Sequence, residues 1–111
     1  MNILIDIDGT VSEDIPNEQA YRFSTAYVLK NAQESVSELY NRGHKITFFT
    51  ARPEKYRNVT ETWLHNNGFK HHHIIFDKPR GGNYVWIDNL DVTGITFNNN
   101  WDQIVSYYPS L

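Results

Sequence analysis

Acidic and basic side chains follow short apolar runs at separate points along this sequence. Asp6 and Asp8 come directly after the first apolar run, and Asp88 comes directly after a later one. Lys78 lies between the two groups. Carboxylates held close together repel each other until a cation lies between them, and Mg²⁺ prefers oxygen ligands of this kind. The residue types therefore predict a site that combines a divalent cation with acid and base groups.

The apolar runs in front of these groups predict strands of a parallel sheet. Residues 2–6 and 45–50 are short, rich in Ile and Phe, and bounded by turn residues. Similar short runs occur at 74–76, 84–87 and 94–97. Each reactive group then follows a strand end or lies in the segment after it.

Helices are predicted between these strands. Ala32, Val36 and Leu39 recur at helical spacing, and Gly43 comes where a helix closes with a left-handed residue. Pro53 suits the first turn of a second helix, which the turn residues 66–68 end, and a last helix is predicted over 101–107. Residues 11–30 show no clean period and predict a flap or loop with a short helix.

Alternating strands and helices predict an α/β protein. We expect a three-layer α/β/α, Rossmann-like arrangement around a mainly parallel sheet of about five strands. A chain of 111 residues is the size of one domain, so residues 1–111 are predicted to form a single domain with residues 11–30 as a flap. Ligands of such sheets bind beyond the carboxyl ends of the strands, where the reactive groups should meet.

The order of these motifs resembles a known superfamily. The run Asp6-Ile7-Asp8-Gly9-Thr10 after an apolar strand, then Thr50, Lys78 and Asp88, resembles the haloacid dehalogenase (HAD) superfamily of phosphatases. The likeness covers nearly the whole chain. It implies a HAD-like fold and hydrolysis of a phosphate ester through an aspartyl-phosphate.

A narrower resemblance and the chain's short gaps refine this expectation. The segments 49–52, 58–64 and 78–79 are similar to the small capsular polysaccharide biosynthesis phosphatases. Members of the superfamily often carry a cap domain after the first motif or between the third and fourth strands. Here the first gap is about twenty residues and the second is the seven residues 77–83. Both gaps are too short for a folded cap. The resemblance therefore implies a capless phosphatase with an open site.

The resemblance implies a role for each acidic residue. Asp6 would be the nucleophile and a Mg²⁺ ligand. Asp8 would protonate the leaving alcohol and then deprotonate the water that hydrolyses the aspartyl-phosphate. The Asp6 side chain, the Asp8 main-chain carbonyl and Asp88 would hold the metal. The predicted catalytic residues are Asp6, Asp8, Thr50 and Lys78.

A phosphate-binding set is implied in the same way. Gly9 would allow a sharp turn whose N–H groups face the phosphate. Thr50 would donate its hydroxyl, and Lys78 would offset the charge of the carboxylates and of the phosphoryl group. The predicted phosphate-binding residues are Gly9, Thr10, Thr50, Ala51, Arg52 and Lys78.

Several features leave alternatives open. Many relatives carry a second acid near the fourth motif, whereas here Asn89 follows Asp88, so Asn89 or Asp91 could support the metal. The run His71-His72-His73 alternates in direction along a strand, which favours surface polar residues over a shared metal ion. Basic residues near the predicted site form either a rim that recruits anions or a solvated helix start: Arg52, Lys55, Arg57 and Arg80.

Bulk composition limits the partners. The net charge of −3 and pI near 5.9 give no general attraction for nucleic acid or anionic lipid. No apolar run approaches the ~20 residues that span a bilayer, and there is no cysteine. We therefore expect a cytoplasmic protein without a membrane partner.

Three functions remain at this point. The first is a Mg²⁺-dependent phosphomonoesterase that acts on a sugar phosphate or a similar small metabolite. The second is a polynucleotide 3′-phosphatase, and the third is a phosphate-binding module without turnover. Substrate identity and oligomeric state are left open, and a homo-oligomer is one way to close a capless site.

Overall fold

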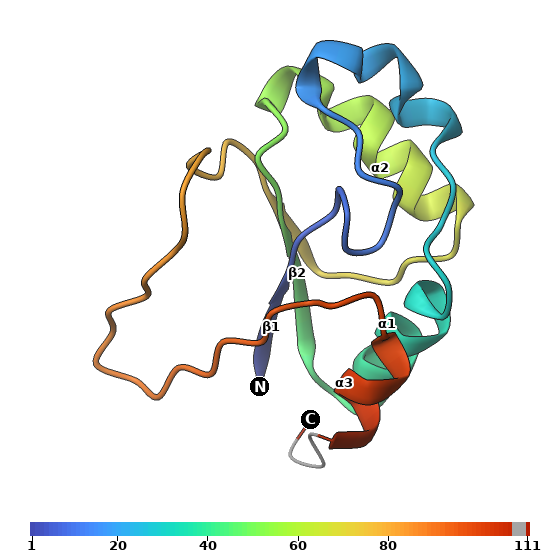
Figure 1. Ribbon diagram of the computed structural model, residues 1–111. Coiled ribbons are helices and arrows are strands. Elements are labelled where there is room, and N and C mark those ends of the chain that lie inside the picture. Colours follow the sequence, from blue (N-terminus) through green and yellow to red (C-terminus); the bar gives the residue numbers. More distant parts are fainter. Residues whose placement is uncertain (108–110) are drawn as a thin grey trace.

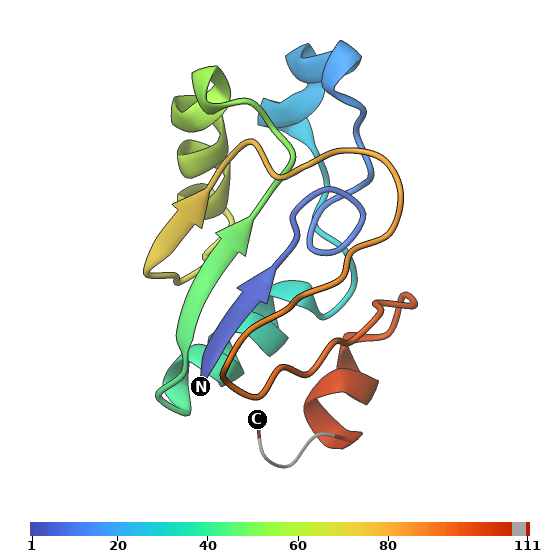
Figure 2. The same cartoon turned by 90° about the vertical axis from the view of Figure 1, so that its left-hand side faces the viewer.

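A three-stranded parallel sheet lies in the middle of the computed structural model, which describes residues 1–107 and 111. The strands are β1 (Asn2–Ile5), β2 (Lys45–Phe49) and β3 (His73–Ile75), in the order β1-β2-β3. Figure 2 shows that all three point the same way. Their carboxyl ends therefore lie at one edge, as the sequence predicts.

The helices lie on one side of this sheet (Figure 1). They are α1 (Ala32–Asn41), α2 (Arg57–Asn66) and α3 (Trp101–Tyr107), with a short 3₁₀ helix, η2 (Glu54–Tyr56), before α2. The inward side chains of the sheet and helices form one apolar cluster. Its members include Ile5, Ile46, Phe48, Val36, Leu39 and Leu64, all at most 5% exposed.

The sequence patterns explain the helix boundaries. Val36 and Leu39 lie on the same face of α1 because they are three residues apart, and both are buried. Gly43 ends α1 with φ 93°, and the His44 N–H then donates to the Leu39 carbonyl. A residue with a Cβ would be strained at this φ. The predicted helix and the strand that follows it are both confirmed.

The flap contains a second 3₁₀ helix, η1 (Asn17–Thr25), which packs against α2. Antiparallel contacts join the two ends of the flap, because the Leu29 N–H donates to the Val11 carbonyl and the Glu13 N–H donates to the Tyr27 carbonyl. The Trp63 indole on α2 donates to the Ala26 carbonyl at 2.9 Å. These bonds fix the flap on the side of the helices.

Two predicted strands, at 84–87 and 94–97, are not formed in the structure. Residues 76–100 contain no helix or strand and form a long loop that leaves the sheet. Gly81 and Gly82 turn the chain with positive φ, and the Tyr84 hydroxyl donates to the Pro79 carbonyl. Residues 84–87 and 94–97 do not join the sheet, and Phe97 instead packs against the core beside Trp101.

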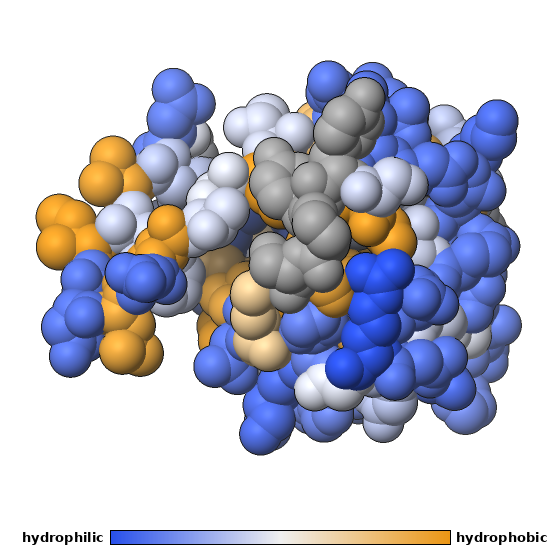
Figure 3. All heavy atoms as spheres, turned by 90° about the horizontal axis from the view of Figure 1, so that it is seen from below, coloured by the Kyte–Doolittle hydropathy of each residue, from blue (hydrophilic) through white to orange (hydrophobic). Residues whose placement is uncertain are grey.

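The three-layer arrangement is confirmed only in part, because no helix of residues 1–107 lies on the second face of the sheet (Figure 1). On this face Leu4 is 39% and Ile75 is 48% exposed. The long loop also projects apolar side chains, which Figure 3 shows on a lobe beside the body. The exposed members are Tyr84, Val85, Trp86, Ile87, Leu90, Val92 and Ile95. The observed fold is an α/β sheet covered on one face.

None of the helices in the described residues has the length and apolar character that crossing a bilayer requires.

Candidate active site

The loops after β2 and β3 are joined to each other at the carboxyl edge of the sheet. The Lys78 N–H donates to the Thr50 carbonyl, and the Asp77 N–H donates to the Arg52 carbonyl, both at 2.9 Å. Asp77 has φ 60°, a left-handed conformation that Asp adopts more readily than most residues. This arrangement turns Lys78 back over the edge of the sheet.

Asp6 and Lys78 meet at this edge. The Lys78 Nζ lies 3.4 Å from Asp6 Oδ1, and the Thr10 hydroxyl donates to Asp6 Oδ2 at 3.3 Å. The Asp6 side chain is 38% exposed and the Lys78 side chain is 14% exposed. Three predicted residues, Asp6, Thr10 and Lys78, therefore do come together, and the Asp6 side chain stays partly open to solvent.

The surroundings of Asp6 shift its proton affinity. Burial raises the pKa of the Asp6 carboxyl above its ordinary value. The Lys78 ammonium and a backbone N–H from Ile7 act in the opposite direction, and the Asp8 charge adds a smaller rise in the pKa. The Lys78 charge therefore lowers the pKa of Asp6 by less than the loss of hydration on burial raises it.

The turn after Asp6 is a tight loop whose amides are used internally. Gly9 has φ 81°, and its N–H donates to the Ser12 carbonyl at 2.9 Å. The Thr10 N–H donates to the Ile7 carbonyl at 3.0 Å. The prediction that Gly9 allows a sharp turn agrees with this geometry. The N–H groups of Gly9 and Thr10 are occupied within the turn, so Thr10 contributes its hydroxyl and not its N–H to Asp6.

Asp8 is held by Arg52 in a two-point ion pair. Arg52 Nε donates to Asp8 Oδ2 and Arg52 Nη2 donates to Asp8 Oδ1, both at 2.9 Å. The third guanidinium nitrogen, Nη1, donates to the Thr60 hydroxyl on α2 at 3.0 Å. The Arg52 side chain is 0% exposed, so it does not form part of a solvated rim. Sequence reasoning assigned Arg52 to phosphate and missed this pairing.

Thr50 and Ala51 follow β2 at the carboxyl edge of the sheet. Thr50 is 0% exposed, and its hydroxyl accepts a hydrogen bond from the Arg52 N–H at 3.1 Å. The Ala51 carbonyl accepts one from the Asn17 side chain at 3.3 Å. Thr50 therefore supports the loop that carries Arg52, and Ala51 links this loop to the flap.

Asp88 does not reach this site in the structure. It lies in the exposed loop, where its Oδ2 accepts from the Trp86 indole at 3.2 Å and its Oδ1 accepts from the Leu90 N–H at 3.1 Å. The Trp86 bond, and then the Leu90 bond, lower the pKa of Asp88. Asn89 and Asp91 lie in the same exposed loop. Within residues 1–107 and 111, no three acidic or histidine residues are grouped so as to hold a metal ion.

The histidine run takes structural positions. His72 Nδ1 accepts from the Ile46 N–H at 3.0 Å, and its ring stacks on Tyr40. His71 Nδ1 lies 3.0 Å from the Phe69 carbonyl, and His73 is exposed on β3. The three side chains therefore have separate surroundings. Only His73 lies in a strand, so the separation comes from contacts with different neighbours and not from alternation along a strand.

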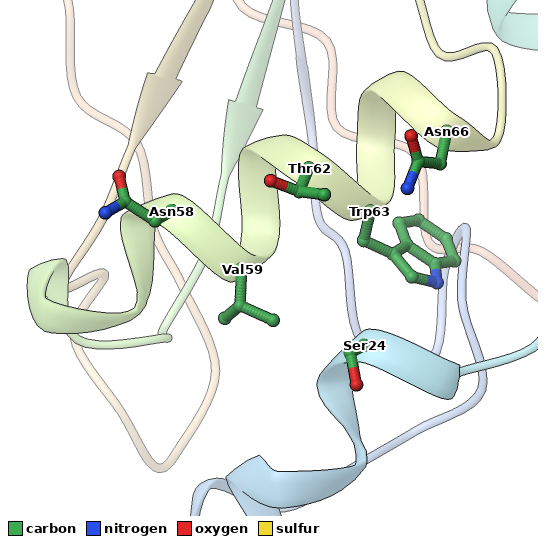
Figure 4. Close-up of a pocket in the computed structure, with 6 residues that line it drawn as sticks. All are labelled: Ser24, Asn58, Val59, Thr62, Trp63 and Asn66. Carbon is green, nitrogen blue, oxygen red and sulfur yellow. The ribbon is translucent and has the colours of Figure 1, made fainter.

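A separate pocket of about 260 Å³ lies between η1 and α2 (Figure 4). Val59 and Trp63 form its apolar part, and four polar side chains complete it: Ser24, Asn58, Thr62 and Asn66. None of the predicted site residues lines this pocket.

Comparison of the sequence with family models assigns the chain to a family. The family model described as "PITM 1-3, LNS2 domain" matches residues 3–88, which is more than half of the chain. The chain belongs to the LNS2 domain family. This family has a HAD-like phosphatase fold, so the coarser part of the predicted resemblance is confirmed. A search of curated proteins finds no match for this LNS2 domain.

Two solved structures are similar to this LNS2 domain in fold. A crystal structure of a target protein from Vibrio cholerae superposes with a TM-score of 0.61 at 19% identity, over 79% of this chain and 80% of the other. A chain in the structure of the Pnkp1/Rnl/Hen1 complex superposes with a TM-score of 0.60 at 18% identity. The latter match covers 68% of this LNS2 domain but only 27% of that chain.

Proposed function

We propose that this LNS2 domain is a phosphomonoesterase that forms an aspartyl-phosphate on Asp6. The observation that carries the proposal is the solvent-accessible Asp6 carboxylate at the strand edge, with the Lys78 ammonium 3.4 Å away and the Thr10 hydroxyl beside it. A carboxylate can attack phosphorus, and a fixed ammonium stabilises the charge of the transferred group. Family membership and the HAD-like fold support the same reaction class.

The reaction needs two steps and one further acid. Asp6 attacks phosphorus and the bond to the leaving oxygen breaks. Asp8, a carboxylate paired with Arg52 in the resting structure, takes up a proton when the substrate binds and gives this proton to the leaving oxygen. Water then attacks the aspartyl-phosphate, passes a proton to Asp8, and releases inorganic phosphate and the Asp6 carboxylate. Asp8 suits both steps because it lies two residues from Asp6 and its side chain is 15% exposed.

Mg²⁺ is the proposed cofactor, and the residues fit it in part. The Asp6 carboxylate is incompletely compensated, since burial outweighs Lys78 and raises its pKa. A divalent cation would supply the missing charge and neutralise the phosphate. The Asp6 side chain and the Asp8 main-chain carbonyl would hold it, because Mg²⁺ is commonly bound by one or two carboxylates plus phosphate and water.

Asp88 would reach the site through a conformational change of the long loop. Among the described residues, β1 pairs with β2 alone, so one edge of β1 is free. Val85 is 87% and Ile87 is 92% exposed, which leaves a β-prone apolar segment in water. We propose that residues 84–87 pair with the free edge of β1 when Mg²⁺ binds, with 94–97 as the next strand. Asp88 would then follow a strand beside Asp6.

A substrate screen with matched variants tests the proposed activity. We expect release of inorganic phosphate from sugar phosphates or similar metabolites in the presence of Mg²⁺, and none after EDTA or in Asp6→Asn. Asp102→Asn removes an exposed carboxylate that is bonded to Asn31 and should retain activity. If the wild-type domain releases phosphate from no member of a panel that spans sugar phosphates, nucleotides and 3′-phosphorylated DNA, the proposal is wrong.

The same panel separates two other candidates. A 3′-phosphorylated oligonucleotide is included because the described residues place no cap domain over the site and because the fold is similar to a chain of the Pnkp1/Rnl/Hen1 complex. Preference for this substrate, with activity that falls as salt rises, would indicate a polynucleotide 3′-phosphatase. Binding of beryllium fluoride without any turnover would instead indicate a phosphate-binding module, which the position of Asp88 favours.

A further inference from the structure

Arg52 brings together three segments that are far apart in the sequence. Its guanidinium makes two bonds to the Asp8 carboxylate and one to the Thr60 hydroxyl on α2. The ring of Phe23, from η1 of the flap, lies under the guanidinium with 3.7 Å between Cζ and the ring centre. One buried cation therefore joins the turn after β1, the flap and α2.

Burial excludes an anion-recruiting role for this cation. Arg52 is 0% exposed, and its guanidinium already faces a carboxylate, a hydroxyl and an aromatic ring. A buried charge without a partner costs several kcal/mol, so exchanging Asp8 for a substrate phosphate would leave Asp8 uncompensated. The guanidinium is therefore committed to Asp8.

We infer that Arg52 is a positioning residue that fixes the carboxylate of Asp8 for proton transfer. This inference rests on the proposed phosphatase function. A planar guanidinium binds both carboxylate oxygens at once and so sets the carboxylate plane as well as its place. Each Asp8 oxygen keeps a further lone pair for the travelling proton. Thr60 and Phe23 hold the guanidinium, so the flap and α2 act on Asp8 through Arg52.

The chemistry of the leaving group distinguishes positioning from general support of the fold. A lysine at position 52 keeps the charge but binds as a single point, so Asp8 loses its fixed orientation. Loss of fixed geometry at a proton-transferring group costs about 10²-fold in rate. In Arg52→Lys we expect kcat/KM to fall by about 10²-fold for glycerol phosphate, whose alkoxide needs a proton. For para-nitrophenyl phosphate, whose leaving group needs none, kcat/KM should change only a few-fold.

Two further variants control this test. Thr60→Val removes one hydrogen bond to the guanidinium. It should lower kcat/KM for glycerol phosphate relative to kcat/KM for para-nitrophenyl phosphate, as Arg52→Lys does, but by a smaller factor. Arg42→Lys changes a surface arginine that pairs with Glu38, and it should leave both kcat/KM values unchanged. Equal losses on both substrates, or unchanged values on both, would overturn the positioning role.

A measurement without turnover separates this inference from the proposed function. Melting temperatures of Asp8→Asn, Arg52→Lys and the double variant should be non-additive, with the double variant losing less than the sum of the single losses. Additive losses would overturn the inference even in an active enzyme. A wild-type domain without phosphatase activity but with non-additive melting would overturn the proposed function and leave Arg52 as the residue that holds Asp8.

Discussion

The Lys78 ammonium lies 3.4 Å from the Asp6 carboxylate although the two residues are 72 positions apart in the sequence. Lys78 reaches this place because its own N–H donates to the Thr50 carbonyl, which fixes the start of its loop on the end of β2. A backbone hydrogen bond of a neighbouring loop thus positions the positive charge that lowers the pKa of Asp6.

Replacing Lys78 should impair both catalysis and ionisation of Asp6. In Lys78→Met we expect kcat/KM to fall by about 10²- to 10³-fold, the range found when a fixed group that stabilises transition-state charge is removed. The pKa of Asp6 should rise further because Lys78 lowers it in the native protein. The acidic limb of the kcat/KM profile should therefore move to higher pH.

The control for this prediction is Lys70→Met. The Lys70 ammonium lies over the Tyr40 ring, away from Asp6. This variant should retain both the rate and the pH profile of the native domain. An unchanged acidic limb in Lys78→Met would contradict the proposed contact.

Removing the charge of Asp6 should stabilise the fold at neutral pH. Because burial raises the Asp6 pKa, the folded state binds the proton more tightly than the unfolded state does. Stability therefore falls as pH rises from the unfolded value of about 3.9 through the raised folded value. Asp6→Asn avoids this loss, so its melting temperature at pH 7 should exceed that of the native domain.

The pH dependence of this difference supplies the check. The advantage of Asp6→Asn should shrink as pH falls from the raised folded pKa toward about 4, and it should be gone below that pH, where the carboxyl is protonated in both the folded and the unfolded state. Asp102→Asn gives the baseline for loss of a surface carboxylate. A lower melting temperature for Asp6→Asn than for the native domain at pH 7 would argue against a net unfavourable environment at Asp6.

Much of the site edge is predictable from the sequence because strand ends are local features. Asp6 follows β1 and Thr50 follows β2, and parallel strands carry their carboxyl ends to one edge. Lys78 is predictable because it lies in the segment that follows β3. The order of apolar runs and reactive residues is enough to place these groups together.

The remaining parts depend on contacts that no local pattern encodes. Arg52 finds Asp8 across 44 positions, and its burial depends on Phe23 and Thr60. The apolar run 84–87 has the composition of a strand, but a strand also needs a partner, and within residues 1–107 β1 pairs with β2 alone. Side-chain pairing and strand pairing are both properties of the folded chain.

Breaking the Asp8–Arg52 pair should destabilise the protein strongly. Asp8→Ala leaves the Arg52 guanidinium buried without a counter-charge, which costs about 3–5 kcal/mol of unfolding free energy. Urea unfolding of the variant measures this loss. Glu38→Ala breaks the exposed pair with Arg42 and should cost at most about 1 kcal/mol. Equal losses in the two variants would show that Arg52 finds water or another partner.

Pairing of residues 84–87 with β1 should make the effect of a substitution depend on Mg²⁺. Val85 is 87% exposed in the loop, so Val85→Thr should change the unfolding free energy by less than about 0.5 kcal/mol without the metal. With Mg²⁺ the paired strand would bury this side chain, and the added hydroxyl should cost about 1–3 kcal/mol. Urea unfolding in the two conditions measures the difference.

The matched control is Val92→Thr, in the same loop but outside both predicted strands. Its effect should be the same with and without Mg²⁺, because Val92 gains no strand partner in the proposed change. Protection of the Val85 and Ile87 amides from hydrogen exchange should appear only with Mg²⁺, since the ladder of a paired strand shields them from water. Fast exchange of both amides at saturating Mg²⁺ would show that the loop stays open and that Asp88 never joins Asp6.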